Sequence, residues 1–162
     1  MDQSTKIYQS TKIIDGFSTC FRQWRAVESH CSQLHGYSLK FKLIFEAATL
    51  DDKNWVQDFG FTKKPFPCKI EGMDNVKSWF SYMYDHTLIV ASDDPEIGTF
   101  KNLGLAGLAS VRVIQNVGCE AFAENVYTFI NAVLILTKQA GRVRLVSVEC
   151  MEHEKNSAIY IP

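Results

Sequence analysis

The fold expected for this chain is predicted from residues 31–47, CSQLHGYSLKFKLIFEA. This stretch carries a candidate reactive thiol just before a strand with a regular apolar pattern. Between Ser38 and Ala47, apolar residues occupy every second position, at Leu39, Phe41, Leu43 and Phe45. This period of two predicts a β-strand with one buried face. Gly36 predicts a turn before the strand, and residues 6–21 form an earlier extended stretch. We therefore expect an antiparallel strand pair, joined by an irregular linker over 23–34.

Farther along the chain, the spacing of apolar residues predicts two helices and several short strands. One helix is expected over 74–84, where Val76, Trp79, Phe80 and Met83 fall at i, i+3, i+4 and i+7. A longer helix is expected over 119–138, and a loop with one helical turn over 93–109. Short strands are predicted at 56–59, 88–91, 111–117, 142–150 and 157–161. This order predicts an α+β fold, with two helices on one face of an antiparallel sheet.

Length and composition limit the class of protein. The chain has 162 residues, 46% of them hydrophobic and 22% charged, which is typical of one globular domain. Its net charge of −1 argues against a nucleic-acid partner, and no apolar run approaches the roughly 20 residues that a membrane span needs. Five cysteines without a CxxC pair predict neither a disulfide framework nor a zinc knuckle. We therefore expect a reducing, cytoplasmic location.

Two polar pairs are candidates for proton chemistry. Cys31 stands near His35, and a thiol becomes a base or nucleophile when a nearby cation lowers its pKa. The alternative is a buried cysteine beside a capping histidine. Asp85 directly precedes His86, and a carboxylate can hold an imidazole in one tautomer if the two side chains meet. A role at a helix end is the alternative for this second pair.

Two glutamates are candidates for ligand binding. Glu152 stands at the end of a predicted strand, where a carboxylate can accept two hydrogen bonds from the amino and ring N–H groups of a pterin or guanine. Its alternative is a solvated acidic turn. Glu120 falls in the first turn of the long helix, where a glutamate suits the positive helix end, so that capping is its default interpretation.

In their order along the chain, these elements resemble the 6-pyruvoyl-tetrahydropterin synthase and 6-carboxytetrahydropterin synthase family over roughly residues 6–160. Members carry the motifs F-x-A-A-H-R, C-x-x-x-H-G-H, D-F, D-H, P-T-x-E-N and V-x-V-x-E with a downstream tyrosine. The matching stretches here are 17–22, 31–37, 58–59, 85–86, 117–121 and 148–152 with Tyr160. Each motif is short, and it is their shared order and spacing that make the resemblance specific.

The resemblance implies a single tunnelling-fold (T-fold) domain over 1–162. It also implies a homo-oligomer, between a dimer and a hexamer, that closes its sheets into a barrel with active sites at the subunit interfaces. The implied activity is that of a lyase on 7,8-dihydroneopterin triphosphate or a related pterin. Its product would belong to the 7-deazaguanine (queuosine) route or to the folate side.

The resemblance also implies roles for individual residues. Cys31 matches the catalytic thiol, and Asp85 with His86 matches the pair that assists its proton transfer. Glu152 matches the glutamate that anchors the amino-pyrimidine edge of the pterin. Glu120 matches a second pterin-site glutamate, with Glu124 as the alternative.

The zinc site of the family is incomplete in this sequence. Members hold zinc with three histidines, and the matching positions here carry Phe21, His35 and Tyr37. Phenylalanine cannot ligate a metal and a neutral tyrosine is a poor ligand, so His35 is the one matching metal ligand. The potential substitute ligands are His30, Cys20 and His153. The sequence therefore predicts altered or absent zinc.

Without zinc, the chemistry needs another electrophile. His35, Tyr37 and Arg22 are candidates to hydrogen-bond a developing oxyanion, and Arg22 with Arg25 is a candidate for the triphosphate. We expect an enzyme that uses Cys31 and the Asp85–His86 pair. The alternatives are a pterin- or purine-binding T-fold that has lost the synthase chemistry, and a structural oligomer with a vestigial pocket.

Overall fold

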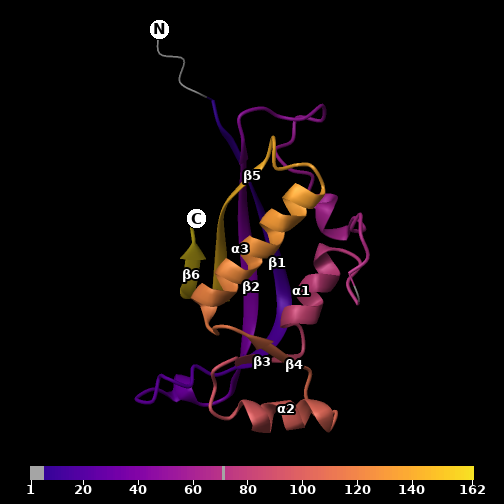
Figure 1. Ribbon diagram of the computed structural model, residues 1–162. Coiled ribbons are helices and arrows are strands. Elements are labelled where there is room, and N and C mark those ends of the chain that lie inside the picture. Colours follow the sequence, from indigo (N-terminus) through magenta and orange to yellow (C-terminus); the bar gives the residue numbers. More distant parts are fainter. Residues whose placement is uncertain (1–5, 71) are drawn as a thin grey trace.

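The computed structural model describes residues 6–70 and 72–162, and its centre is one six-stranded sheet. The strands are β1 (Tyr8–Phe21), β2 (His35–Ala47), β3 (Thr87–Ala91), β4 (Val111–Ile114), β5 (Arg144–His153) and β6 (Asn156–Tyr160). They lie in the order β4-β3-β1-β2-β5-β6. The α-helices are α1 (Val76–Tyr84), α2 (Ile97–Leu105) and α3 (Cys119–Leu136). Figure 1 shows α1 and α3 across one face of the long strands, with α2 at the end of the molecule near β3 and β4.

The pair β1–β2 is the antiparallel hairpin that the alternating pattern predicts. All four apolar residues of the pattern are fully buried, and those between them are half-buried. A bulge interrupts β1, where Asp15 and Gly16 lie between the pairs Ile14–Phe41 and Phe17–Leu39. Gly16 has a φ of +89°, which an L side chain would strain. The glycine thereby permits the bulge that interrupts the regular pairing of the longest strand.

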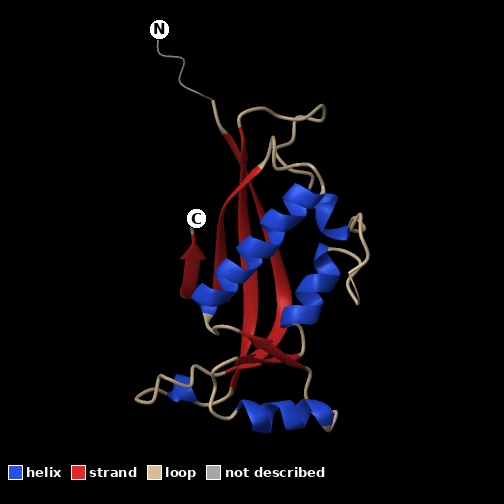
Figure 2. Ribbon diagram, in the orientation of Figure 1, coloured by secondary structure: helices blue, strands red, loops and turns tan. Residues whose placement is uncertain are grey.

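The sheet is mixed rather than wholly antiparallel. β3 pairs in parallel with the last residues of β1, and β4 pairs in parallel with β3. A parallel pair needs a crossover, which α2 supplies within the segment expected to be a loop with one helical turn. Figure 2 shows α2 as a helix in addition to the two that the sequence predicts. Phe100 of α2 is buried against Leu88 and Val90, so packing stabilises a helix that contains two glycines.

The segment 56–59, predicted as a short strand, leads into a 3₁₀ turn at Phe59–Lys63. Asp58 is the cause, because its Oδ1 accepts the N–H of Gly60 at 2.7 Å and its Oδ2 accepts Lys64 Nζ at 2.7 Å. A side chain that satisfies the backbone locally competes with a strand ladder. The prediction of a strand here was therefore wrong.

α3 is the central helix of the core. It has 18 residues and is apolar enough by composition to cross a membrane. Its buried residues, which belong to the main hydrophobic cluster on the sheet, are Phe122, Ala123, Val126, Ile130, Val133 and Leu134. This one-sided burial is the pattern of a core helix.

Among the described residues, the long strand β1 and the terminal strand β6 each have an unpaired edge. β3 covers β1 only from Thr19 to Phe21, so residues 8–18 keep an open edge. β6 pairs with β5 on one side only. Pairing such edges between subunits would close the sheets into a barrel. The barrel-shaped homo-oligomer remains a prediction.

Candidate functional site

One cavity of about 190 Å³ brings together four of the residues predicted for the site. Cys31 comes from the β1–β2 linker, Tyr37 from β2, Glu120 from α3 and Glu152 from β5. Glu124 lies instead in a separate depression with Asn116 and Thr128. Residues far apart in sequence therefore place a thiol, a phenol and two carboxylates around one space.

The turn that carries Cys31 is fixed by backbone hydrogen bonds. The N–H of Gln23 donates to the Cys31 carbonyl at 2.8 Å, and the N–H of Cys31 donates to Ser29 Oγ at 3.2 Å. Ser29 caps a single 3₁₀ turn, His30–Ser32. The thiol is half-buried. It is thus held at the cavity wall while remaining accessible.

Glu152 reaches the cavity because of a bulge in β5. Leu145 pairs with Phe45 and Ser147 with Ile44, which leaves Val146 as the extra residue. After the bulge, Val148 and Cys150 are fully buried. Glu152 follows two residues later, where the pairing of β5 with β6 is irregular between Met151 and His153, and its side chain lines the cavity. The carboxylate therefore lies at the end of the buried row, beside the cavity.

Glu120 lies opposite, in the first turn of α3. Gly118 precedes the helix with a φ of +123°, and a Cβ there would lie 2.6 Å from Gln23 Nε2. Glycine thus permits the close approach of Gln23, which also lines the cavity. The two carboxylates and the Gln23 amide give the cavity several hydrogen-bonding groups for a heterocycle.

Aromatic side chains fill the positions that match the zinc ligands of the family. The rings of Phe21 and Tyr37 stack with centroids 4.1 Å apart and planes 14° apart. Burial, followed by the charge of Glu152, raises the pKa of Tyr37 to about 12, so its hydroxyl stays neutral. That hydroxyl lies 2.5 Å from His35 Nε2. These residues do not fit a three-histidine zinc site.

A different group of metal-binding atoms lies where the linker meets the start of β2. One ligand atom each from His30, Cys31 and His35 lies within 4.8 Å of the other two. His35 Nδ1 is 2.9 Å from the carbonyl oxygen of Gln33. Because a carbonyl only accepts, Nδ1 carries the proton and Nε2 is the nitrogen with a free lone pair.

Asp85 and His86 meet each other but not this cavity. His86 Nδ1 lies 2.9 Å from Asp85 Oδ1, and the N–H of Ser18 donates to the same oxygen at 3.3 Å. His86 has a left-handed φ of 53°, and its side chain is 84% exposed. The pair stands before β3, on the side of β1 away from β2. Within one chain, it is therefore separated from Cys31.

Arg22 also faces away from the cavity, because an ion pair holds it. Its Nε and Nη2 donate to the two oxygens of Asp94 at 2.9 and 2.6 Å. The Asp94 side chain is 1% exposed, and the guanidinium lowers the pKa of that carboxyl. Arg22 Nη1 also reaches the Ser32 carbonyl at 3.5 Å. The arginine thus joins the segment after β3 to the turn that carries the thiol.

Sequence reasoning missed several cavity residues, among them Cys119 and Asn156. The thiol of Cys150 lowers the pKa of Cys119, and the same contact, followed by burial, raises the pKa of Cys150. Cys119 directly precedes Glu120, and Asn156 opens the strand after Glu152. A position within four residues of a predicted glutamate was thus the one sequence signal for either residue.

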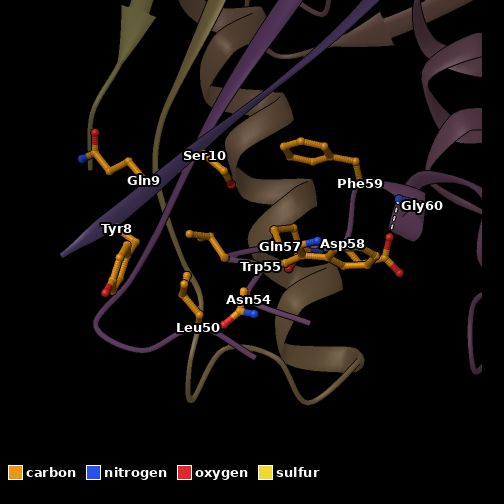
Figure 3. A pocket seen from close by; sticks show the side chains of 11 residues that line it. Tyr8, Gln9, Ser10, Leu50, Asn54, Trp55, Gln57, Asp58, Phe59 and Gly60 are labelled. Carbon is orange, nitrogen blue, oxygen red and sulfur yellow. Dashed lines mark hydrogen bonds between the residues drawn. The ribbon is translucent and has the colours of Figure 1, made fainter. Parts of the chain in front are cut away.

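A second, larger cavity of about 560 Å³ lies between the start of β1 and the 50–60 loop (Figure 3). Trp55 and Phe59 supply aromatic walls. Gln57 is 3% exposed, and neither amide atom has a hydrogen-bond partner among the described residues. At about 3.3 Å per residue, Ser10 in this cavity lies roughly 35 Å along β1 from Phe21 in the other. The two cavities are separate within one chain.

Comparison with known proteins gives one family. A family model described as 6-pyruvoyl tetrahydropterin synthase matches residues 11–162. A curated 6-carboxy-5,6,7,8-tetrahydropterin synthase from Rickettsia bellii (strain RML369-C) is 31% identical over 71 residues, which is 44% of this chain and 44% of that protein. The alignment thus spans less than half of that relative's length.

Solved structures share the fold at low sequence identity. An uncharacterized protein from Wolinella succinogenes has a TM-score of 0.75 at 21% identity, covering 96% of this chain and 98% of its own. The 6-pyruvoyl tetrahydropterin synthase from Caenorhabditis elegans has a TM-score of 0.62 at 16% identity, and the match covers 98% of this chain and 97% of that protein. The 6-pyruvoyl tetrahydropterin synthase from Plasmodium vivax has a TM-score of 0.61 at 12% identity, and the match covers 94% of this chain and 97% of that protein. The T-fold expected from the sequence is confirmed.

Proposed function

We propose that this chain is a lyase acting on 7,8-dihydroneopterin triphosphate or a related pterin. The premise is its family: the chain belongs to the 6-pyruvoyl tetrahydropterin synthase family. The observation that carries this proposal is the cavity in which Cys31, Glu120 and Glu152 converge. A half-buried thiol and carboxylates around one space suit proton transfer on a bound heterocycle.

Glu152 anchors the substrate in this proposal. Its carboxylate accepts two N–H groups from the amino-pyrimidine edge, which places the pterin side chain toward the Cys31 turn. Glu120 and the phenol of Tyr37 supply further hydrogen bonds. Because the pKa of Tyr37 is raised to about 12, its hydroxyl keeps its proton at neutral pH and can turn that O–H from His35 Nε2 to a developing oxyanion.

Cys31 and the Asp85–His86 pair share the proton transfer. Cys31 takes a proton from the substrate side chain, or returns one to it. Asp85 accepts the Nδ1 proton of His86 and so leaves Nε2 free toward solvent. Since the pair lies outside the cavity of its own chain, we propose that it acts in the cavity of a neighbouring subunit of a barrel-shaped oligomer. The open edges of β1 and β6 support such an assembly.

Two further roles follow from the contacts. The stacked rings of Phe21 and Tyr37 support the proposal that zinc is lost from the family position. Arg22 is already neutralised by Asp94, so we propose that it positions the Cys31 turn rather than holding the triphosphate. A cytoplasmic location and a product of the 7-deazaguanine or folate routes remain part of the proposal. Five free cysteines agree with that location.

The test is incubation of the purified protein with 7,8-dihydroneopterin triphosphate, with release of triphosphate as the measurement. We expect turnover that Cys31→Ala lowers at least about 100-fold. The matched control Cys68→Ala, at an exposed thiol, should leave it unchanged. Turnover that persists in Cys31→Ala would contradict the assigned role of the thiol.

The alternative is a pterin- or purine-binding protein without synthase chemistry, which the aromatic pair in place of two zinc ligands favours. Binding measured by pterin fluorescence separates the two. Glu152→Gln should weaken binding at least about tenfold, while the exposed Glu154→Gln should not. Binding without turnover would establish the alternative. Binding that is indifferent to Glu152→Gln would contradict both functions.

A further inference from the structure

We propose that His30, Cys31 and His35 form a metal site that replaces the three-histidine site of the family, and that a metal bound there switches off the Cys31 thiol. The first part stands on the linker geometry alone. The second part rests on the proposed function, because it needs a reaction that the thiol performs.

The three ligand atoms are almost close enough for one ion. Each lies within 4.8 Å of the other two, and the rings of His30 and His35 have centroids 5.6 Å apart. Tetrahedral zinc with bonds of about 2.0–2.3 Å places its ligands roughly 3.3–3.7 Å apart. Binding would therefore draw the ligand atoms together by up to roughly 1–1.5 Å, and the exposed side chain of His30 has room to rotate toward the other two.

The surroundings of His35 already resemble those of a metal ligand. The Gln33 carbonyl accepts the Nδ1 proton at 2.9 Å, which fixes the tautomer that leaves Nε2 to bind an ion. Nε2 now faces the Tyr37 hydroxyl, so the ion would take the position of that contact. The Gln33 N–H in turn donates to the His30 carbonyl at 3.0 Å. The turn His30–Ser32 and the first residue of β2 thus present all three ligands.

The relocation has a chemical consequence. Metal binding by Cys31 releases the thiol proton to solvent and commits the sulfur lone pair to the metal. A sulfur bound in this way cannot accept a proton from a substrate. Phe21 and Tyr37 fill the family position, and an ion in the proposed site takes Cys31 itself as a ligand. We therefore expect zinc to inhibit the proposed reaction instead of supporting it.

The binding test uses cobalt(II) added to the metal-free, full-length protein. A thiolate ligand gives a sulfur-to-cobalt charge-transfer band in the near ultraviolet, and we expect this band at a 1:1 ratio. Cys31→Ser should abolish the band, and His30→Ala and His35→Ala should each weaken cobalt affinity at least about tenfold. Cys68→Ser and His153→Ala are the matched controls and should change neither the charge-transfer band nor the cobalt affinity. Circular dichroism confirms that each variant is folded.

Absence of the band, or its persistence in Cys31→Ser, would overturn the metal site whatever the activity assay shows. In the activity assay, one equivalent of zinc should lower triphosphate release at least about tenfold, and a chelator should restore it. Turnover that appears only with zinc would overturn the switch and leave the binding result intact. If no condition gives turnover, the proposed reaction and the switch both fail, while the cobalt spectrum still decides the site.

Discussion

Removal of the Asp94 carboxylate should destabilise the protein and loosen the turn that carries Cys31. Asp94 is 1% exposed and accepts two hydrogen bonds from Arg22, whose own side chain is 21% exposed. Removing one partner of a buried ion pair costs about 3–5 kcal/mol, because the remaining charge stays buried. Since Arg22 keeps some contact with water, we expect Asp94→Asn to lower the free energy of unfolding by about 3 kcal/mol.

The assay is urea denaturation at one fixed protein concentration, because an oligomer's stability depends on concentration. A loss of this size corresponds to a fall of roughly 6–12 °C in Tm for a chain of this length. The adjacent Asp93 is the matched control, since its pair with Arg25 is exposed on both sides. Asp93→Asn should leave stability unchanged within error. Equal effects of the two substitutions would refute the argument from burial.

The pH dependence gives a second check. Arg22 lowers the folded pKa of Asp94, so the carboxylate stabilises the fold at every pH above its unfolded pKa of about 3.9. That contribution is lost as the pH falls through the lower, folded pKa. The difference in stability between the wild type and Asp94→Asn should therefore be constant near pH 7 and shrink below about pH 4. A difference that grows under acidic conditions would contradict the sign of the shift.

Two other substitutions test the cavities. Gln57→Leu should raise the free energy of unfolding by about 1–2 kcal/mol, because it removes two buried amide atoms that have no partner among the described residues. The measurement is urea denaturation. A lower free energy of unfolding would show that the amide is satisfied by a ligand or a second subunit. Gly118→Ala should lower the free energy of unfolding by about 1–3 kcal/mol, owing to its φ of +123°. In the same assay Gly141→Ala should leave the free energy of unfolding nearly unchanged, because an added Cβ there meets no atom within 4 Å.

The sequence predicted the elements whose burial is periodic. The alternation from Leu39 to Phe45 gave β2 correctly because one face of that strand is fully buried. α2 escaped prediction because its two glycines weaken helix propensity and only packing of Phe100 compensates. The strand predicted at 56–59 failed because Asp58 caps a turn there. Long-range packing and local capping are both invisible to periodicity.

The candidate site was predictable where the chain order of motifs constrained it. Cys31, Glu120 and Glu152 come to one cavity, as their match to family motifs implied. The pairing of Arg22 with Asp94 was not predictable, since the two residues are distant in sequence and neither belongs to a periodic pattern. Nor does the sequence show where Asp85 and His86 lie, because β3 joins β1 on the side away from the thiol.

The Arg22–Asp94 pair also gives the segment 93–109 a function. Asp94 is the second residue of that segment. Its Oδ1 accepts the N–H of Glu96 ahead of α2, and its two oxygens accept hydrogen bonds from Arg22. Arg22 in turn reaches the carbonyl of Ser32, next to Cys31. The segment therefore completes the parallel crossover of the sheet and fixes the thiol turn from one buried carboxylate. A change in α2 that shifts Asp94 is expected to disturb the Cys31 turn without touching the cavity itself.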